Sequence, residues 1–302
     1  MGREAGSVGP PPMSIRAVKS VTESTPTLEG AGVHLRRAFG FGNTDEFDPF
    51  LLFDDFRGDH PSSYLAGFPW HPHRGIETIT YVLAGHVDHG DSLGNCGTLG
   101  AGDIQWMTAG SGIIHQEMPQ GSATGRMWGF QLWANLPRAE KMMAPRYRGI
   151  TAPEIPVVTT ADGATVRIIC GQVDGVQGPV REIVTDPEYL DVSLPAGKTF
   201  TRAVKPGYTV FAYVVEGEGY FDPGRTAGAC PEGLVALYEP AGDTVVVTTD
   251  KQPVRFLLVS GKPLNEPVAW RGPIVMNTQD ELRTAFEEVE RGTFIKAAGA
   301  VG

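Results

Sequence analysis

Cysteine is scarce in this sequence, with only Cys96, Cys170 and Cys230 among 302 residues. Their number is odd, they lie far apart and none forms a Cys-x-x-Cys pair, so neither a disulfide framework nor a zinc finger is indicated. A reducing compartment is therefore expected. No targeting segment is visible, which makes the cytoplasm the expected location, with the nucleus as a second location if the source is eukaryotic.

Positive charge and long apolar runs are also in short supply. The 25 lysines and arginines are outnumbered by 35 aspartates and glutamates, which leaves a formal net charge of -10. The basic residues are not clustered, so direct binding of nucleic acid through phosphate neutralisation is excluded. No run approaches the roughly 18 consecutive apolar residues that a membrane span requires. We therefore expect a soluble protein that contacts neither nucleic acid nor a membrane.

Histidine is missing from the whole second half of the chain. All seven histidines fall within the first 115 residues, at His34, His60, His71, His73, His86, His89 and His115. A chain of this length is long enough for two domains of ordinary size. Imidazole-based chemistry must therefore be confined to the first domain, and the second domain must serve another purpose.

What the sequence does contain is a regular succession of short strand-like runs. β-branched and aromatic residues dominate runs such as 76–83 and 208–216, and Gly, Pro and Asp separate the runs. This pattern with little helix predicts an all-β protein built from barrels or sandwiches. The run 214–221 mirrors the run 81–85, which indicates that a barrel has been duplicated.

The expected domain organisation follows from these patterns. Residues 1–13 are rich in Gly and Pro and predict a disordered leader, residues 14–147 form a first barrel, and residues 148–302 form a second barrel. The Pro-, Gly- and Arg-bearing stretch 147–156 is the expected linker. A capping box from Thr278 to Glu281, apolar residues at Leu282, Phe286 and Val289, and Gly292 as a stop signal predict one amphipathic helix near the C-terminus, which packs on a barrel.

Two short motifs in the first half carry alternating pairs of metal-binding residue types. His71 and His73 form one pair, and His115 and Glu117 form the other. Residues i and i+2 of a β-strand point to the same face, so two such strands facing each other would form a pocket of three imidazoles and one carboxylate. Without a thiolate, this donor set favours Fe(II), Mn(II), Ni(II), Co(II) or Cu(II) over a structural zinc site. The second half has no counterpart, so its barrel is expected to be metal-free.

Several other residues have two interpretations each. Asp54 and Asp55 are expected to be solvated acids on a core strand, with a second metal site as the alternative. His86 and His89 are expected either to support the metal ligands from behind or to lie at the surface. Aromatic and sulfur-containing side chains close to the ligands in sequence could line an apolar pocket or pack in the core, namely Phe53, Phe56, Trp70, Trp106 and Met107.

Three blocks of the first half resemble the signature blocks of the pirin family of bicupins. They are residues 71–78, 85–92 and 102–118, and the shorter runs 47–50 and 132–137 are also similar to that family. The resemblance implies two stacked cupin barrels with iron, as Fe(II), in the N-terminal barrel. It implies His71, His73, His115 and Glu117 as the ligands. Glu77 stands where many other cupins place their carboxylate ligand and is the reserve candidate.

The resemblance also implies two functions of different classes. The first is a quercetin 2,3-dioxygenase-like enzyme that opens a flavonol, a small phenolic substrate, with O2, in which Glu117 would also act as the catalytic base. The second is a metal-dependent regulatory protein, a transcriptional co-regulator or modulator of a metabolic enzyme, which acts on a protein partner without turnover. A storage-like cupin whose metal only stabilises the barrel is a third reading.

Overall fold

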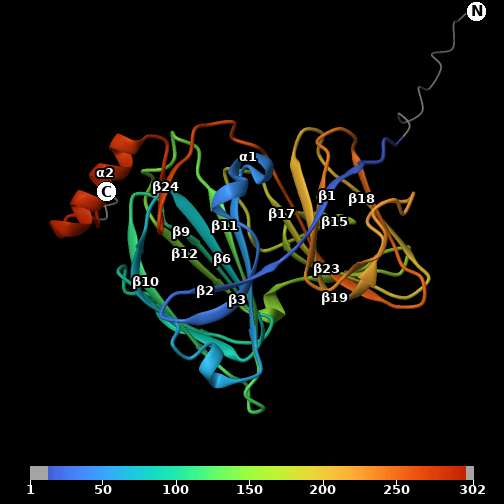
Figure 1. Cartoon of the computed structure of the whole chain (residues 1–302), viewed down its shortest axis with the longest axis horizontal. Coiled ribbons are helices and arrows are strands. Elements are labelled where there is room, and N and C mark those ends of the chain that lie inside the picture. The colour runs from blue at the N-terminus through green and yellow to red at the C-terminus, as the bar shows by residue number, and fades with distance from the viewer. Residues whose placement is uncertain (1–12, 297–302) are drawn as a thin grey trace, which may run out of the picture.

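The computed structural model describes residues 13–296, so the expected leader lies outside the described residues except for Met13. Two β-barrels lie side by side, the first in blue to green and the second in yellow to orange (Figure 1). Two α-helices occur in the described part, α1 (Thr44–Phe47) and α2 (Gln279–Glu290), with short 3-10 turns at η1 (Phe41–Asn43), η2 (Pro61–Ser63) and η3 (Ala152–Glu154). The expected all-β class with a few short helices is confirmed.

The first barrel is built from two antiparallel sheets. The larger sheet has the spatial order β12 (Arg146–Ile150), β9 (Ile104–Thr108), β6 (Ile76–Ala84), β11 (Met127–Asn135), β4 (Phe50–Gly58), β3 (Val33–Phe39) and β2 (Thr25–Glu29). The smaller sheet has the order β5 (Phe68–His73), β10 (Ile113–Gln120), β7 (His86–Asp91) and β8 (Cys96–Leu99). The smaller sheet carries both metal-ligand motifs.

The second barrel repeats this arrangement. Its main sheet has the order β1 (Val18–Glu23), β21 (Leu234–Tyr238), β19 (Thr209–Gly219), β23 (Val254–Gly261), β17 (Glu188–Leu194), β14 (Thr165–Cys170) and β13 (Val157–Thr159), and β20 (Cys230–Pro231) pairs with β19. Three two-stranded pairs complete the chain, β15 (Gln172–Val173) with β16 (Val176–Gln177), β18 (Thr199–Ala203) with β22 (Thr244–Thr248), and β24 (Ala269–Arg271) with β25 (Ile274–Met276). The β18–β22 pair corresponds to β5–β10, but it places buried Phe200 opposite buried Val247.

The ends of the chain are exchanged between the barrels, which differs from the expected boundaries. Strand β1, assigned to the first barrel from the sequence, pairs with β21 and so completes the sheet of the second barrel. Strand β12 covers the start of the expected linker and is the edge strand of the first barrel, paired with β9. Neither strand pairing could be predicted from the neighbouring residues, because each depends on a partner strand far away in the sequence.

The C-terminal segment 269–296, here called the C-terminal strap, packs on the first barrel rather than the second. Val275 of β25 shares a buried apolar cluster with Ile76 and Met107, and Ile114 of β10 packs against a second cluster that includes Leu282 of α2. Figure 1 shows α2, in red, on the outer side of the first barrel. The predicted capping box of this helix is present, with the Glu281 backbone amide donating to Thr278 Oγ1 at 3.2 Å. Within residues 13–296, no helix is long and apolar enough to cross a membrane.

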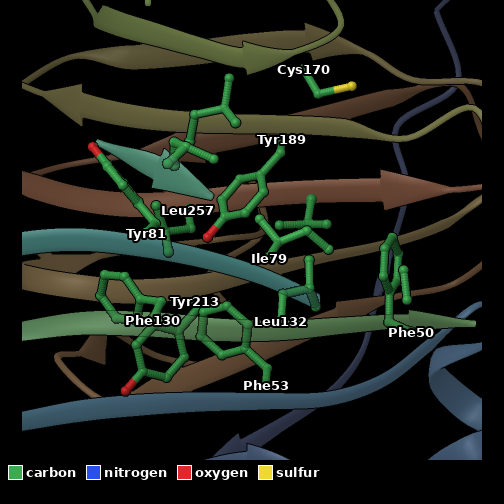
Figure 2. Packing of buried hydrophobic residues seen from close by; sticks show 14 of the residues in the cluster. Phe50, Phe53, Ile79, Tyr81, Phe130, Leu132, Cys170, Tyr189, Tyr213 and Leu257 are labelled. Carbon is green, nitrogen blue, oxygen red and sulfur yellow. The ribbon is translucent and has the colours of Figure 1, made fainter. Parts of the chain in front are cut away.

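A single large apolar cluster joins the two barrels. Aromatic and aliphatic side chains of β4, β6 and β11 meet those of β17, β19 and β23, as Figure 2 shows for Phe53, Phe130, Tyr189 and Leu257. This cluster contains buried side chains from the main sheets of both barrels, so the barrels form one packed unit. Burial of this much apolar surface supplies the main driving force for their association.

Candidate metal centre

The pairing of β5 with β10 brings three histidines together. His115 lies opposite His71, and Ile113 lies opposite His73, in the antiparallel register of these strands. One ring nitrogen from each of His71, His73 and His115 lies within 4.8 Å of the others. The two motifs, about forty residues apart in sequence, therefore converge as the alternation predicted.

Glycine permits the tight approach of the strap behind this site. Gly75 directly follows the His71–His73 motif, with a φ of +77°. A Cβ atom there would lie 2.0 Å from the carbonyl oxygen of Val275, so only glycine fits. The backbone after the histidine motif is thus pressed against β25.

The hydrogen bonds of the histidines leave their Nε2 atoms available as ligands. A carbonyl oxygen can only accept, so Nδ1–H of His71 donates to Pro69 at 2.8 Å and Nδ1–H of His73 donates to Pro273 at 2.9 Å. The two Nε2 lone pairs then face each other at 3.0 Å, an arrangement that a bound cation relieves. His115 Nε2 is buried and has no hydrogen-bond partner among residues 13–296. These three imidazoles fit a divalent metal ion.

Burial keeps these imidazoles neutral, as metal ligation requires. Desolvation, with smaller contributions from the neighbouring histidines, lowers the pKa of His73 and of His115 well below the usual value. Burial also lowers the pKa of His71, although the Pro69 carbonyl opposes this effect. Neutral imidazole is the ligating form, so the site needs no proton release from histidine to bind a metal at neutral pH.

Glu117 lies on the same strand as His115 but outside the three-histidine group. Its carboxylate is buried, and Oε1 accepts a hydrogen bond from Thr80 Oγ1 at 2.7 Å. Burial raises the pKa of the Glu117 carboxyl to about 7, and the Thr80 hydrogen bond opposes the shift. Its role as fourth ligand and catalytic base stays a prediction.

The side chain of Glu77, the reserve candidate for the carboxylate ligand, points away from the three histidines. Its Oε1 accepts from Thr108 Oγ1 at 2.6 Å, and burial raises the pKa of this carboxyl. Arg146, Arg148 and Cys170 are among its electrostatic neighbours, which places Glu77 toward the second barrel. It belongs neither to the histidine group nor to the lining of the adjoining cavity.

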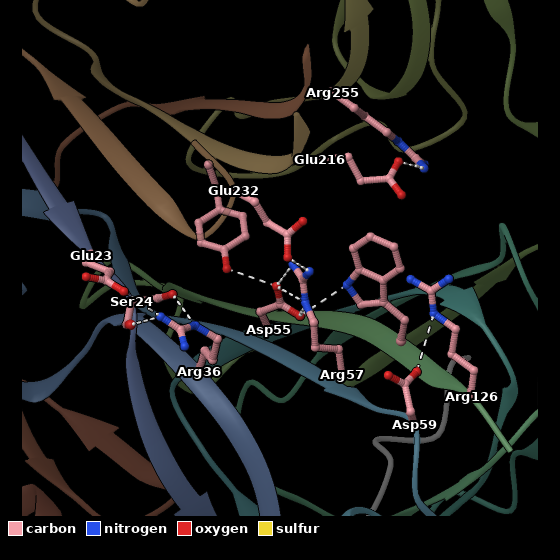
Figure 3. A network of polar contacts seen from close by, with 12 residues as sticks. Glu23, Ser24, Arg36, Asp55, Arg57, Asp59, Arg126, Glu216, Glu232 and Arg255 are labelled. Carbon is pink, nitrogen blue, oxygen red and sulfur yellow. Dashed lines mark hydrogen bonds and ion pairs between the residues drawn. The ribbon is translucent and has the colours of Figure 1, made fainter. Parts of the chain in front are cut away.

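The two aspartates of β4 are neither solvated nor free to hold a second metal, contrary to both interpretations of the sequence. Arg37 donates to both carboxylate oxygens of Asp54, at 2.8 and 2.7 Å. Burial raises the pKa of Asp54 to about 6 against the effect of that ion pair. Asp55 accepts from Arg57, Trp128 and Tyr213 (Figure 3). Both carboxylates are buried because each has a matched set of donors.

The remaining histidines of the candidate set do not enter the cluster. His86 is half-buried at the start of β7. His89 is buried, stacks on Tyr147 and shares a 2.7 Å hydrogen bond with its hydroxyl group. His89 thus lies on β7, the strand beside β10, opposite Glu117.

A cavity of about 580 Å³ adjoins His71, His73 and Glu117. Of the five expected lining residues, only Phe56 contributes to it. Phe53 and Trp106 pack between the barrels, Met107 packs beneath the strap, and Trp70 is 56% exposed. Side chains that the sequence reasoning missed form most of the remaining wall, among them Leu35, Arg37, Phe41, Leu52, Asp54, Phe68, Gln131, Trp133 and Trp270.

The fold and the site together define a bicupin, a protein of two cupin-type barrels, with a histidine-rich candidate metal centre in the first barrel. Residues 32–134 match the pirin family model, and residues 189–295 match the model of the pirin C-terminal cupin domain. The chain therefore belongs to the pirin family.

Similar proteins come from several lineages. A pirin-like protein of Caulobacter vibrioides is 44% identical over 93% of this chain and 100% of its own length. A Pseudomonas aeruginosa protein, provisionally named a quercetin 2,3-dioxygenase, is 41% identical over 92% of this chain and 97% of its own. The crystal structure of a quercetin 2,3-dioxygenase from Acinetobacter baumannii superimposes with a TM-score of 0.84 at 30% identity, covering 93% of this chain and 99% of that one.

Proposed function

We propose that this protein is an Fe(II)-dependent dioxygenase that opens a flavonol-type phenolic substrate with O2. The observation that carries the proposal is the convergence of three neutral imidazoles beside a cavity of about 580 Å³. That volume lies in the range of small-molecule sites, and its lining is largely apolar with a few polar groups. Relatives named for quercetin 2,3-dioxygenase activity support the choice of substrate class.

In this proposal His71, His73 and His115 hold the metal, and Glu117 is the fourth ligand. A divalent transition metal supplies Lewis acidity and, in the case of iron, redox chemistry. The second barrel is proposed to bind no metal, because its corresponding strand pair carries apolar side chains such as Phe200 and Val247.

Glu117 is also proposed to accept the proton of the substrate hydroxyl group. A cation bound beside Glu117 would keep its carboxylate ionised, and an ionised carboxylate within reach of the substrate hydroxyl group can accept its proton. Thr80 has one hydroxyl proton and two acceptors in reach, Glu117 Oε1 at 2.7 Å and Gln131 Oε1 at 2.8 Å. Thr80 therefore donates to ionised Glu117 and can turn to Gln131 once Glu117 is protonated.

Oxygen uptake tests the proposal directly. The protein is purified without oxygen, loaded with Fe(II) until elemental analysis gives a constant metal content, and mixed with quercetin in an oxygen electrode. We expect oxygen consumption that depends on both iron and quercetin. If fully loaded protein consumes no oxygen with quercetin or related phenols, the enzymatic proposal is wrong and the regulatory function is favoured.

A further inference from the structure

Four aromatic rings form a continuous series from the protein surface to the histidine cluster, here called the aromatic ladder. Phe41 lies against Trp270 with 5.3 Å between ring centroids, and Trp270 lies 5.8 Å from Trp133. Trp133 in turn contacts His73 edge to face at 5.0 Å. Because Phe41, Trp133, Trp270 and His73 all line the cavity, the ladder forms one of its walls.

The position of the ladder is unusual for a purely structural cluster. Phe41 is 69% exposed, and Trp133 and Trp270 are only half-buried, although the core of this barrel has buried places for aromatic side chains. Large aromatic groups that stay partly exposed beside a concave site are typical of binding surfaces. The three rings contact one another at interplanar angles of 51° and 41°, so a further flat ring would pack on their cavity-facing sides rather than between them.

Trp270 is held in place by its own hairpin. Its Nε1–H donates to the carbonyl oxygen of Gly272 at 2.7 Å, within the turn between β24 and β25. The only polar atom of the indole is therefore satisfied, and its ring stays available to a ligand. The neighbouring residue Pro273 accepts the hydrogen bond from His73, so the same turn supports both a metal ligand and the cavity wall.

We propose that the aromatic ladder is the subsite for the flat ring that a substrate carries beyond its metal-binding head, and that Trp270 is the residue that selects for flatness. This inference rests on the proposed function, since it places the metal-binding head at the histidines. Trp270 belongs to the segment of the chain that follows the second barrel. The C-terminal strap would thus determine the specificity of a site whose ligands all lie in the first barrel.

Three probes with the same 3-hydroxy-4-pyranone head test the inference on Fe(II)-loaded protein without oxygen, where no turnover occurs. 3-Hydroxyflavone carries a fused benzo ring and a flat 2-phenyl ring, its 2-cyclohexyl analogue differs only in a saturated ring of similar size in place of the phenyl ring, and maltol carries neither ring. Calorimetric titration should show that 3-hydroxyflavone binds about tenfold more tightly than the cyclohexyl analogue. Equal affinities in the unmodified protein would overturn the inference, whether or not any variant folds.

Variants of Trp270 identify the residue responsible. Trp270→Leu should weaken 3-hydroxyflavone binding about tenfold and leave maltol binding and iron content unchanged, and Trp270→Phe should restore most of the loss. Phe286→Leu, on the same strap but outside the cavity lining, is the matched control and should change none of these quantities. Unchanged 3-hydroxyflavone affinity in Trp270→Leu, or a parallel loss of maltol binding or iron, would refute a ligand-contacting role.

The two proposals fail in different ways. Trp270-dependent binding without oxygen uptake on admission of air would overturn the dioxygenase function and support the subsite. Normal oxygen uptake with identical affinity in Trp270→Leu would support the function and overturn the subsite.

Discussion

The Nδ1 atom of His73 donates to the carbonyl oxygen of Pro273 at 2.9 Å, across 200 positions of the sequence. This bond fixes the tautomer that leaves Nε2 available, as partners behind ligating histidines commonly do. The strap that carries Pro273 is fastened nearby by Arg74. That guanidinium donates to Glu288 at 2.7 Å and to the Phe294 carbonyl at 3.0 Å, and it stacks on the Phe294 ring.

Removal of the contacts between Arg74 and the C-terminal strap should lower both the stability of the fold and the metal affinity. Arg74→Met removes a buried charge that is paired with α2, and we expect the free energy of unfolding to fall by about 3 kcal/mol. Iron content after dialysis should fall as well, because His73 loses its fixed partner. Urea unfolding and elemental analysis measure the two effects. Arg291→Met, which removes an exposed pair with Glu287 on the same helix, should change stability by less than about 1 kcal/mol.

Removal of one imidazole should abolish metal retention. Loss of a group that only orients a ligand already weakens metal binding about 10- to 100-fold. His71→Ala removes a ligand itself, so its metal affinity should fall by more than this. Elemental analysis of the purified variant measures the retained metal. The exposed residue His34 provides the control, since His34→Ala should keep the normal content. If purified His71→Ala still contained stoichiometric metal, His71 would not be a metal ligand.

Isosteric substitution can distinguish the roles of Glu117 and Glu77 in catalysis. Glu117→Gln should lower kcat/KM for oxygen uptake with quercetin at least about 100-fold, because the amide cannot accept the substrate proton. The amide oxygen still accepts from Thr80, so the fold should be retained. Glu77→Gln lies outside the cavity lining and should leave uptake within about threefold of normal. The reverse pattern would make Glu77 the functional carboxylate.

Lys141 should make stability depend on pH in the alkaline range. Its ammonium is buried against the carbonyls of Gly75 and Val275 and the side chain of Asn135, and burial lowers its pKa to about 7, although Glu266 and Glu281 oppose the shift. Between about pH 7 and 10.5, the unfolded chain then binds a proton that the folded chain does not. The lysine's contribution to the free energy of unfolding therefore rises with pH in this window, by at most about 1.4 kcal/mol per pH unit.

The Lys141→Met variant tests this contribution. Urea unfolding at several pH values from 6 to 9 should show the wild type gaining stability relative to the variant above pH 7. The exposed residue Lys251 provides the control, and Lys251→Met should follow the wild type at every pH. A constant difference between wild type and Lys141→Met across this range would contradict the prediction.

The elements that the sequence predicted are those set by local patterns. The alternation of His71 with His73, and of His115 with a residue two positions later, was enough to predict that three imidazoles converge. The capping box at Thr278 was also confirmed, because helix capping involves only neighbouring residues. The all-β class followed from strand-like runs of the kind found at 76–83 and 208–216.

A tyrosine stands at the start of the run 81–85 and another directly precedes the mirrored run 214–221, and each makes a hydrogen bond that the sequence did not predict. Tyr81 donates across the barrel interface to Asp191 at 2.6 Å, and Tyr213 donates in the opposite direction to Asp55 at 2.9 Å. Each aspartate is also paired with an arginine of its own barrel, Asp191 with Arg255 and Asp55 with Arg57, and Figure 3 shows the second of these pairs. The similarity of the two runs is visible in the sequence, but the reciprocal hydrogen bonds depend on how the barrels pack against each other.

The features that the sequence could not predict all depend on distant partners. Asp54 is buried because Arg37 reaches it from the neighbouring strand, and no spacing rule identifies that pair. Trp270 enters the cavity wall from a segment more than 130 residues beyond Trp133. Neither residue lies in a motif whose spacing could have indicated its contribution.

The exchange of chain ends has a consequence for how the molecule can be divided. A cut in the connection after β12 would leave an N-terminal fragment with β1, which the other half requires, and a C-terminal fragment with the strap that supports His73. Each fragment would carry a segment that the other barrel needs, so neither half is expected to fold correctly on its own. The two barrels have similar strand arrangements, but the exchanged chain ends make each barrel depend on the other half of the chain.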